Sequence, residues 1–385
     1  SLSGLSYTYP GGVEQSVQTR LEQYINVRDF IPDGTNTATA NCSPFIQAAV
    51  DAAHAAGARV YFDASPNGIY RCTETITLPV YTVLSGSAGL MYYPNASDQG
   101  TGDNSTYPDW AKHSPCIQCE VPNDGALFSC SPRTGSSCFV TFEYMGFRNL
   151  SGSNPVFDEA YSRFKADSCL FHRFGPIMPA DITKGWGGLK IHKTYFNVCG
   201  DRTHNTDPNP FDNAQGLFEG AIVDCIITES TFTECTKPFV FKASAGLNII
   251  ANNRIEQGGG PAITLQTAGS RCNVIEGNLF DGQKGPAIKI TTTDAPTIIS
   301  NNLFWRNGQA WPPVSQGGTT RNQDNCHISI GNASELHITG NTFQRGARDG
   351  GGTINSLPKH IALIGSMTNG GVVKFTDNDT HTRFW

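Results

Sequence analysis

A six-residue pattern of apolar and polar positions recurs along the second half of the chain. An apolar residue is followed by two variable residues, a small polar residue or glycine, one further residue and a second apolar one. Six copies are Ile191–Phe196, Ile227–Phe232, Ile250–Ile255, Ile275–Phe280, Ile299–Phe304 and Ile338–Phe343. Such short β-branched and aromatic runs, with no helical periodicity between them, predict strands joined by turns.

The polar residue of each copy measures the length of the repeat. Steps of 23, 25 and 24 residues separate the successive markers Ser230, Asn253, Asn278 and Asn302. The next steps, to Asn341 and Asn378, are 39 and 37 residues, which indicates an inserted loop of about 12 to 15 residues in each. Upstream, Ser168 and Thr194 are 26 residues apart, and 36 residues separate Thr194 from Ser230.

A period near 24 residues is typical of the coils of a parallel β-helix, in which each coil buries its apolar face only by stacking on its neighbours. A leucine-rich repeat has a similar period but requires a Leu-x-x-Leu-x-Leu pattern, which is missing. We therefore predict an all-β fold, a right-handed single-stranded parallel β-helix. The asparagines at the repeated turn are expected to accept left-handed backbone geometry and to stack as a ladder.

The N-terminal region carries different signals. Ser43 can cap a helix that has Pro44 at its start and Gly57 at its end. One face of this helix is apolar, with Phe45, Ile46, Ala49, Val50 and Ala53. Strands are predicted at 59–62, 69–72 and 75–78, whereas residues 92–137 are predicted to be irregular and rich in loops.

These signals divide the chain into three parts. Residues 1–40 form a lead-in, 41–90 a short capping helix with the first coils, and 91–385 the parallel β-helix with its loop insertions.

Composition narrows the possible functions. The net charge of -6 argues against a protein that neutralises nucleic-acid phosphates, and no apolar stretch approaches the ~20 residues of a membrane span. Cys116-x-x-Cys119 with Cys130 and Cys138 lacks the spacing of a common zinc site, so buried thiols are expected. Cys199 and Cys235 take equivalent positions on successive coils, where we predict stacked free thiols. Neither a metal nor a cofactor is predicted.

The segment Val17–Gly34 resembles the opening of bacteriophage tailspike bodies, because a Val-Gln-Thr-Arg-Leu run leads into Val-Arg-Asp-Phe and an Asp-Gly turn. Phe45–Ala53 and Gly57–Phe62 are similar to the start of the pectate-lyase-like β-helix superfamily. One departure is that Asp33-Gly34 is followed by Thr-Asn-Thr where the family has Asp-Asp-Thr.

This resemblance implies a homotrimer of side-by-side β-helices on the virion tail. Such a protein acts outside the cell as a depolymerase, binding and cutting host capsular or O-antigen polysaccharide. The region that attaches it to the phage tail is expected before residue 17 and is missing from this chain.

The residue after the inward-facing Phe or Ile of each motif is predicted to point outward, because side chains alternate along a strand. Down successive coils this column reads Asn197, Thr233, Glu256, Asp281, Trp305 and Gln344. Glycoside hydrolysis needs two carboxyl groups, one to donate a proton and one to activate water or attack the sugar. Glu256, Asp281 and Glu234, which is one place further along its own coil, are the candidate catalytic residues.

The expected spacing of these carboxylates suits such a pair. Neighbouring coils place Glu256 and Asp281 ~4.8 Å apart at the backbone, a distance at which like charges raise one pKa of a pair. Glu234 and Asp281 lie two coils apart, about 10 Å, near the ~6.5–9.5 Å of inverting glycosidases. Trp305 is predicted to stack on a sugar, with Arg254 and Arg306 as further substrate-binding candidates.

A lyase is the alternative chemistry, because β-elimination needs a base near the C5 proton of a uronate and a cation for its carboxylate. Cations expected near the same face are Arg254, Lys289, Arg306 and His172. Two further alternatives are a non-catalytic receptor-binding fibre and a secreted, monomeric enzyme of the pectinase type.

The long insertions at 200–218, 306–327 and 345–360 offer other sites, since loops on one edge of a solenoid often hold the binding function. Aromatic and cationic residues in them are Trp311, Arg321, His327 and Arg345. Grooves between protomers could instead use Asp201, Asp207, Asp212 or Asp224. Asn205-Thr206-Asp207 resembles the first polygalacturonase motif, but no Asp-Asp pair or Gly-His-Gly follows, so we interpret it as chance.

Overall fold

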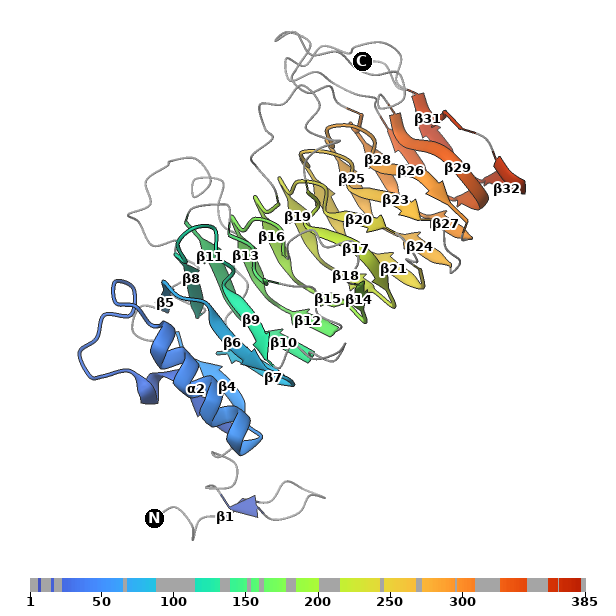
Figure 1. Cartoon of the computed structure of the whole chain (residues 1–385). Coiled ribbons are helices and arrows are strands. Elements are labelled where there is room, and N and C mark those ends of the chain that lie inside the picture. The colour runs from blue at the N-terminus through green and yellow to red at the C-terminus, as the bar shows by residue number, and fades with distance from the viewer. Residues whose placement is uncertain are drawn as a thin grey trace, which may run out of the picture.

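Coils stack along one axis to form a solenoid, which the computed structural model shows from α2 at one end to β31 and β32 at the other (Figure 1). The structure describes residues 6–7, 15–16, 23–64, 68–87, 115–131, 139–150, 154–158, 163–177, 185–200, 215–242, 246–267, 272–294, 296–308, 326–344, 359–365 and 367–381. In this part of the chain, no helix is long and apolar enough to cross a membrane.

The capping helix α2 (Ser43–Ala56) covers the first coils, as the sequence predicted, after a 3-10 turn η1 (Val27–Phe30). Its end at Gly57 is confirmed, because this residue takes left-handed geometry with φ 64°. The predicted cap is wrong by one residue: Cys42 is the N-cap, and Ser43 is the first helical residue. The Ser43 hydroxyl instead donates to the carbonyl of Glu74 at 3.2 Å and accepts from that residue's amide.

From residue 218 onward, each coil contributes one strand to each of three parallel sheets. The first sheet contains β5 (Ile69–Cys72), β8 (Cys116–Cys119), β11 (Gly146–Asn149), β13 (Leu170–His172), β16 (Tyr195–Asn197), β19 (Thr231–Thr233), β22 (Arg254–Glu256), β25 (Leu279–Asp281), β28 (Leu303–Trp305), β30 (Thr342–Gln344) and β33 (Asp379–His381). The second sheet contains β17 (Phe218–Val223), β20 (Phe239–Lys242), β23 (Ile263–Thr267), β26 (Ile288–Thr293), the start of β29 (Cys326–Thr339) and β31 (Lys359–Leu363). Earlier in the chain, β6 (Ile76–Pro79) and β9 (Phe128–Ser131) form a separate two-stranded parallel sheet.

The third sheet runs the whole length of the solenoid. It contains β3 (Tyr24–Asn26), β4 (Arg59–Phe62), β7 (Thr82–Gly86), β10 (Phe139–Glu143), β12 (Arg163–Asp167), β15 (Lys190–His192), β18 (Ile226–Thr228), β21 (Asn248–Ala251), β24 (Asn273–Glu276), β27 (Thr297–Ser300), the end of β29 and β32 (Met367–Thr376). Outside these sheets, β14 (Gly185–Gly187) pairs with the end of β17, and β1 (Ser6–Tyr7) pairs antiparallel with β2 (Gln15–Ser16). The region 92–137 is more regular than predicted, since it contains β8 and β9.

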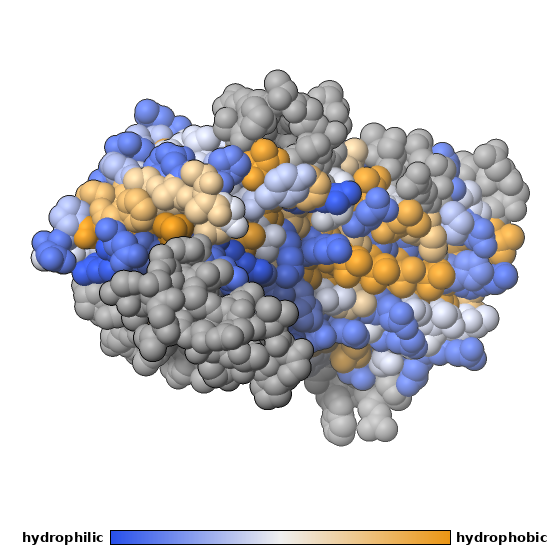
Figure 2. Space-filling view, turned by 90° about the horizontal axis from the view of Figure 1, so that it is seen from below, coloured by the Kyte–Doolittle hydropathy of each residue, from blue (hydrophilic) through white to orange (hydrophobic). Residues whose placement is uncertain are grey.

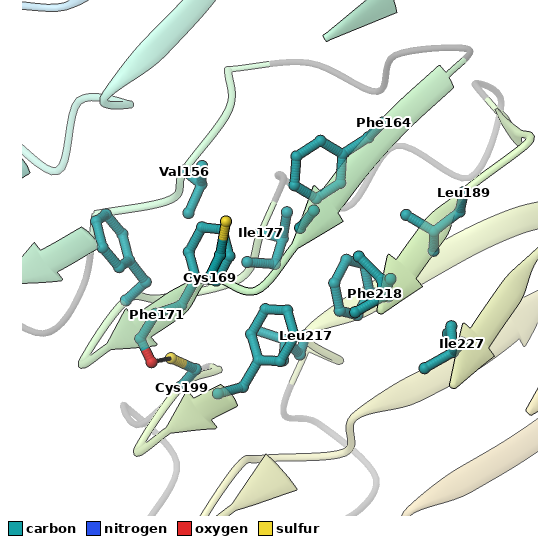
Figure 3. Close-up of a cluster of buried hydrophobic side chains, with 14 of the residues drawn as sticks. Val156, Phe164, Cys169, Phe171, Ile177, Leu189, Cys199, Leu217, Phe218 and Ile227 are labelled. Atoms are coloured by element: carbon teal, nitrogen blue, oxygen red, sulfur yellow. Dashed lines mark hydrogen bonds between the residues drawn. The ribbon is translucent and has the colours of Figure 1, made fainter. Parts of the chain in front are cut away.

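Stacked aromatic rings fill the interior. Phe171 lies 4.9 Å from Phe196 with the rings 5° from parallel, and Phe196 lies 4.8 Å from Phe232 at 3°. These rings pack with buried aliphatic residues and thiols (Figure 3). Cys199 and Cys235 are buried free thiols, as predicted, and the Cys199 thiol donates to the carbonyl of Phe171 at 3.4 Å. Coil-to-coil stacking is therefore continuous through the core.

The predicted asparagine ladder is confirmed at the turn between the third and first sheets. The Asn253 and Asn278 amides donate to the Oδ1 of the next ladder residue, at 3.0 and 2.9 Å. Two details were wrong. The left-handed residue is the one before the ladder position, such as Asn252 with φ 58°, and the earliest marker is Cys169 instead of Ser168, because the Cys169 amide donates to the Thr194 hydroxyl.

Candidate functional site

The outward column predicted on the first sheet is confirmed residue by residue, because its members pair across neighbouring parallel strands. It continues in both directions, and its full order is Arg71, Gln118, Arg148, His172, Asn197, Thr233, Glu256, Asp281, Trp305, Gln344 and His381. The column therefore places one residue on each coil, at a spacing of ~4.8 Å. Within it, Gln118, Asn197 and Thr233 are buried, whereas Glu256 and Trp305 are partly exposed.

Glu256 is held by two neighbours. Its Oε2 accepts from Nε and Nη2 of Arg254 at 2.7 and 2.6 Å, and its Oε1 accepts from the Thr233 hydroxyl at 3.0 Å. The Glu256 side chain is 13% exposed, whereas that of Arg254 is 52% exposed. The carboxylate thus has a fixed orientation, and the guanidinium remains accessible to a ligand.

Asp281, on the next coil, is bound in the same manner. Arg306 donates from Nε to Oδ1 at 2.8 Å and from Nη2 to Oδ2 at 2.5 Å, a bidentate pair. The same guanidinium lies over the ring of Trp305, 4.4 Å from its centroid. Trp305 therefore offers a sugar only the ring face that Arg306 does not cover. Because each carboxylate has its own arginine, this is not the cluster of unscreened like charges that the sequence predicted.

Glu234 differs from the other two carboxylates. It is exposed, with left-handed backbone at φ 54°, and its amide donates to the carbonyl of Glu256 at 3.0 Å. Lys284, two coils further along, is close enough for its charge to interact with Glu234. Burial lowers the pKa of Lys284 to about 8, and the attraction of Glu234 opposes that fall. Lys284 was not predicted from the sequence, because it lies outside the repeated motif and its burial depends on the folded structure.

Several other candidates lie away from this cluster. Lys289 lies on β26 of the second sheet, so the expectation that it is near the same face as the carboxylate cluster is wrong. His172 does lie in the column, three coils from Glu256. His327 is buried on β29 instead of in a loop, and Asp224 lies at the turn before the third sheet. The remaining loop candidates fall outside the described residues: Trp311, Arg321, Arg345, Asp201, Asp207 and Asp212.

Arg148 and Arg173 were not predicted from the sequence, although His172 was expected near this face. Arg148 and His172 lie on neighbouring coils, with Arg173 directly after His172. The repeat steps supply the only available signal, because 30 residues separate Gln118 from Arg148 and 24 separate Arg148 from His172. Extending the register upstream of residue 168 would have placed Arg148 in the column.

A cavity of about 400 Å³ lies at the other end of the chain, between α2 and β7. Its walls include Val50, His54, Arg59 and Tyr81 but no carboxylate. It is separate from the column, which carries the carboxylates that glycoside hydrolysis needs, so the first sheet is the better candidate site.

Comparison with known proteins supports the architecture. Residues 206–343 match the family described as "Right handed beta helix region". No curated protein matches the sequence. Among solved structures, DFA-IIIase from Arthrobacter chlorophenolicus A6, in complex with DFA-III, is 13% identical with a TM-score of 0.56, over 93% of this chain and 85% of that one.

Two viral structures are also similar. ORF18 of Geobacillus virus E2 is 14% identical with a TM-score of 0.49, over 98% of this chain and 68% of that one. The tailspike protein of E. coli bacteriophage HK620, in complex with a pentasaccharide, is 12% identical with a TM-score of 0.45, over 99% and 71%. Together with the three parallel sheets, the family match and the DFA-IIIase structure show that this chain is a right-handed parallel β-helix protein.

Proposed function

We propose that this chain is the body of a phage tailspike that binds and cleaves a bacterial capsular or O-antigen polysaccharide by glycoside hydrolysis. The observation that carries the proposal is the cluster on the first sheet. Glu234, Glu256 and Asp281 lie on three successive coils, with two arginines and Trp305 beside them. Aromatic and charged side chains aligned on one face of a solenoid suit an extended polar chain of sugars, either uncharged or acidic.

The environments of the carboxylates suggest different roles. Glu234 is exposed, and no described side chain hydrogen-bonds to its carboxylate, so it can exchange a proton with the leaving-group oxygen. Asp281 is oriented by Arg306 and lies two coils away, about 10 Å at the backbone, which leaves room for the attacking water. We assign Glu234 as the general acid and Asp281 as the base. Glu256, between them, would stabilise the positive charge that develops on the sugar ring.

The sequence resemblance at Val17–Gly34 supports the tailspike assignment. In this proposal the protein is part of the virion tail, acts outside the cell and is attached to the tail through a region that precedes these residues. The partners in this proposal are therefore the host polysaccharide, the phage tail and two further copies of the chain.

An apolar stripe on the third sheet supports the proposed homotrimer. Its outward residues pair across β18, β21, β24 and β27 and are Ile226, Ile249, Val274 and Ile298. Ile226 and Ile249 are each 41% exposed, and an orange band crosses this face of the molecule (Figure 2). Contiguous apolar surface of this kind is typical of protein interfaces. We propose that the copies associate through this stripe, on a different sheet from the carboxylates.

The test is product analysis after incubation with a panel of bacterial capsules and O-antigens. New reducing ends without absorbance at 235 nm are expected, since hydrolysis leaves no double bond. Reducing ends accompanied by that absorbance would replace hydrolysis with β-elimination. If the protein binds a polysaccharide but releases neither product from it, the protein is a non-catalytic receptor-binding fibre.

One observation favours the lyase as the second candidate. With a pKa of about 8, Lys284 is partly neutral near physiological pH, and a neutral amine can remove a proton from carbon. In that reaction Arg254, Arg306 or both would neutralise the uronate carboxylate.

A further inference from the structure

Arg148 lies in the column of the first sheet in an unusual state. It occupies the third position of β11, in the same outward register as Glu256, yet the residue is only 8% exposed. Its Nε has no hydrogen-bond partner, and Arg148 forms no ion pair, within the part of the chain that the structure describes. Burial, as the main cause, lowers the pKa of this guanidinium. The chain thus holds a desolvated positive charge at this point.

A second arginine stands beside it on the next coil. Arg173 has left-handed backbone at φ 58°, and its amide donates to the carbonyl of Asn197 at 3.0 Å. The Nε of Arg173 is also buried without a partner among the described residues. Its charge repels that of Arg148, which adds to the effect of burial.

The carboxylate that interacts with Arg148 already has other partners. Glu120 binds Nη2 of Arg71 at 2.8 Å and accepts from Nε2 of Gln118 at 2.6 Å. It is therefore oriented toward Arg71 and acts on Arg148 only through space. Within the described residues, neither Arg148 nor Arg173 forms an ion pair with a carboxylate.

A buried charge without a counter-ion is unfavourable, and such groups concentrate where a ligand supplies the opposite charge. Guanidinium is suited to this role because its planar fork of N–H donors matches the two oxygens of a carboxylate.

We propose that Arg148 and Arg173 form an anion subsite that binds the carboxylate of an acidic sugar in the polysaccharide. The carboxylate would accept from guanidinium N–H donors of the two arginines. This proposal rests on the proposed function only for the class of ligand, a glycan. It adds that the glycan is acidic.

The position of the subsite agrees with a chain of sugars lying along the column. Arg173 and Arg148 are three and four coils from Glu256, about 14 and 19 Å. The intervening coils carry Asn197 and Thr233 in the column, which are neutral, polar and buried. An acidic sugar anchored at the arginines would therefore place a bond several sugars away at the carboxylate cluster.

The test uses the whole chain and simple probes. Thermal unfolding is measured with sodium glucuronate, glucose and sodium sulfate, all at one ionic strength. Glucuronate is expected to raise the unfolding temperature while glucose does not. In Arg148→Gln and Arg173→Gln the apparent dissociation constant of glucuronate should rise about tenfold or more, as expected for loss of a charge-assisted pair. Arg163→Gln is the matched control, because Arg163 lies on the third sheet over Phe139.

Three results would overturn the proposal. The first is an unchanged response to glucuronate in both Arg148→Gln and Arg173→Gln. The second is the absence of any rise in unfolding temperature when glucuronate is added to the wild type. The third is an equal rise with sulfate. The result is independent of cleavage: Glu256→Gln should retain the glucuronate response whether or not the wild type cuts a polysaccharide.

Discussion

Replacing Arg148 by methionine should make the protein more stable, although arginine-to-methionine changes at partnered sites do the reverse. Methionine keeps much of the packing volume and removes the buried, unpaired charge. Replacing a buried ion pair by well-packed apolar side chains can stabilise a protein by about 1–4 kcal/mol. A buried charge without a partner is less favourable than a buried ion pair, so its replacement should stabilise the protein as well. Because the Arg148 guanidinium is not fully sealed from water, we expect a gain at the lower end, about 1–2 kcal/mol.

The expected shift in unfolding temperature follows from the size of the chain. An unfolding entropy of about 2.1 cal/mol/K per residue gives about 0.8 kcal/mol/K for the 385 residues. A gain of about 1–2 kcal/mol therefore raises the unfolding temperature by about 1–3 °C. Differential scanning calorimetry without added oxyanions measures this shift.

Arg71 provides the control, because it occupies the same column on β5. It donates from Nε to Glu120 at 2.9 Å, so Arg71→Met should lower the unfolding temperature. A loss of stability in Arg148→Met comparable to that in Arg71→Met would refute the reasoning. It would mean that Arg148 serves the fold, and the anion subsite would lose its main support.

Three further predictions concern other parts of the molecule. Lys284→Met should stabilise the protein at pH 7, and this gain should disappear by about pH 10.5. Between the folded pKa of about 8 and the ordinary 10.5, the unfolded wild type binds more protons than the folded one, so the stability of the wild type rises with pH only in that window. Unfolding measured at several pH values tests this, and a gain that does not vary with pH would contradict it. Ile249→Glu should leave the chain monomeric in analytical ultracentrifugation, if the wild type is a trimer that uses the apolar stripe; a trimer that persists would exclude this surface. Asn278→Ala should lower the free energy of unfolding by about 2–4 kcal/mol, because it leaves the Ile250 carbonyl and the Asn253 amide without their ladder partner. A denaturant titration measures this loss, and a loss below about 1 kcal/mol would show that the ladder contributes little.

The sequence predicted much of this architecture because the repeat is a local signal repeated many times. One polar marker per coil was enough to set the register of Glu256, Asp281 and Trp305, and every pair in that column is confirmed. The errors of one residue at Ser43 and Ser168 have a common cause. The patterns show that a turn or cap is present, but neighbouring serines and cysteines differ only in contacts made after folding.

The chemical environment of the site was beyond the sequence. Arg254 and Arg306 were predicted to contact substrate, but their hydrogen bonds to Glu256 and Asp281 depend on side-chain orientations that spacing does not determine. Lys289 was misplaced because a coil turns through three faces and its strand belongs to the second sheet. The burial of Arg148 depends on packing around a coil upstream of the regular repeat.

The most direct test of the proposed hydrolase compares variants of the cluster on a polysaccharide that the wild type cleaves. Glu234→Gln and Asp281→Asn should each lower the rate of reducing-end release by about 100-fold or more, the usual effect of removing a general acid or base. Glu229→Gln is the matched control. Glu229 is also exposed and left-handed, with φ 51°, but it lies at the opposite end of strand β19, so the rate of this variant should stay near that of the wild type. Full activity in both Glu234→Gln and Asp281→Asn would contradict the account, because cleavage would then take place away from this cluster.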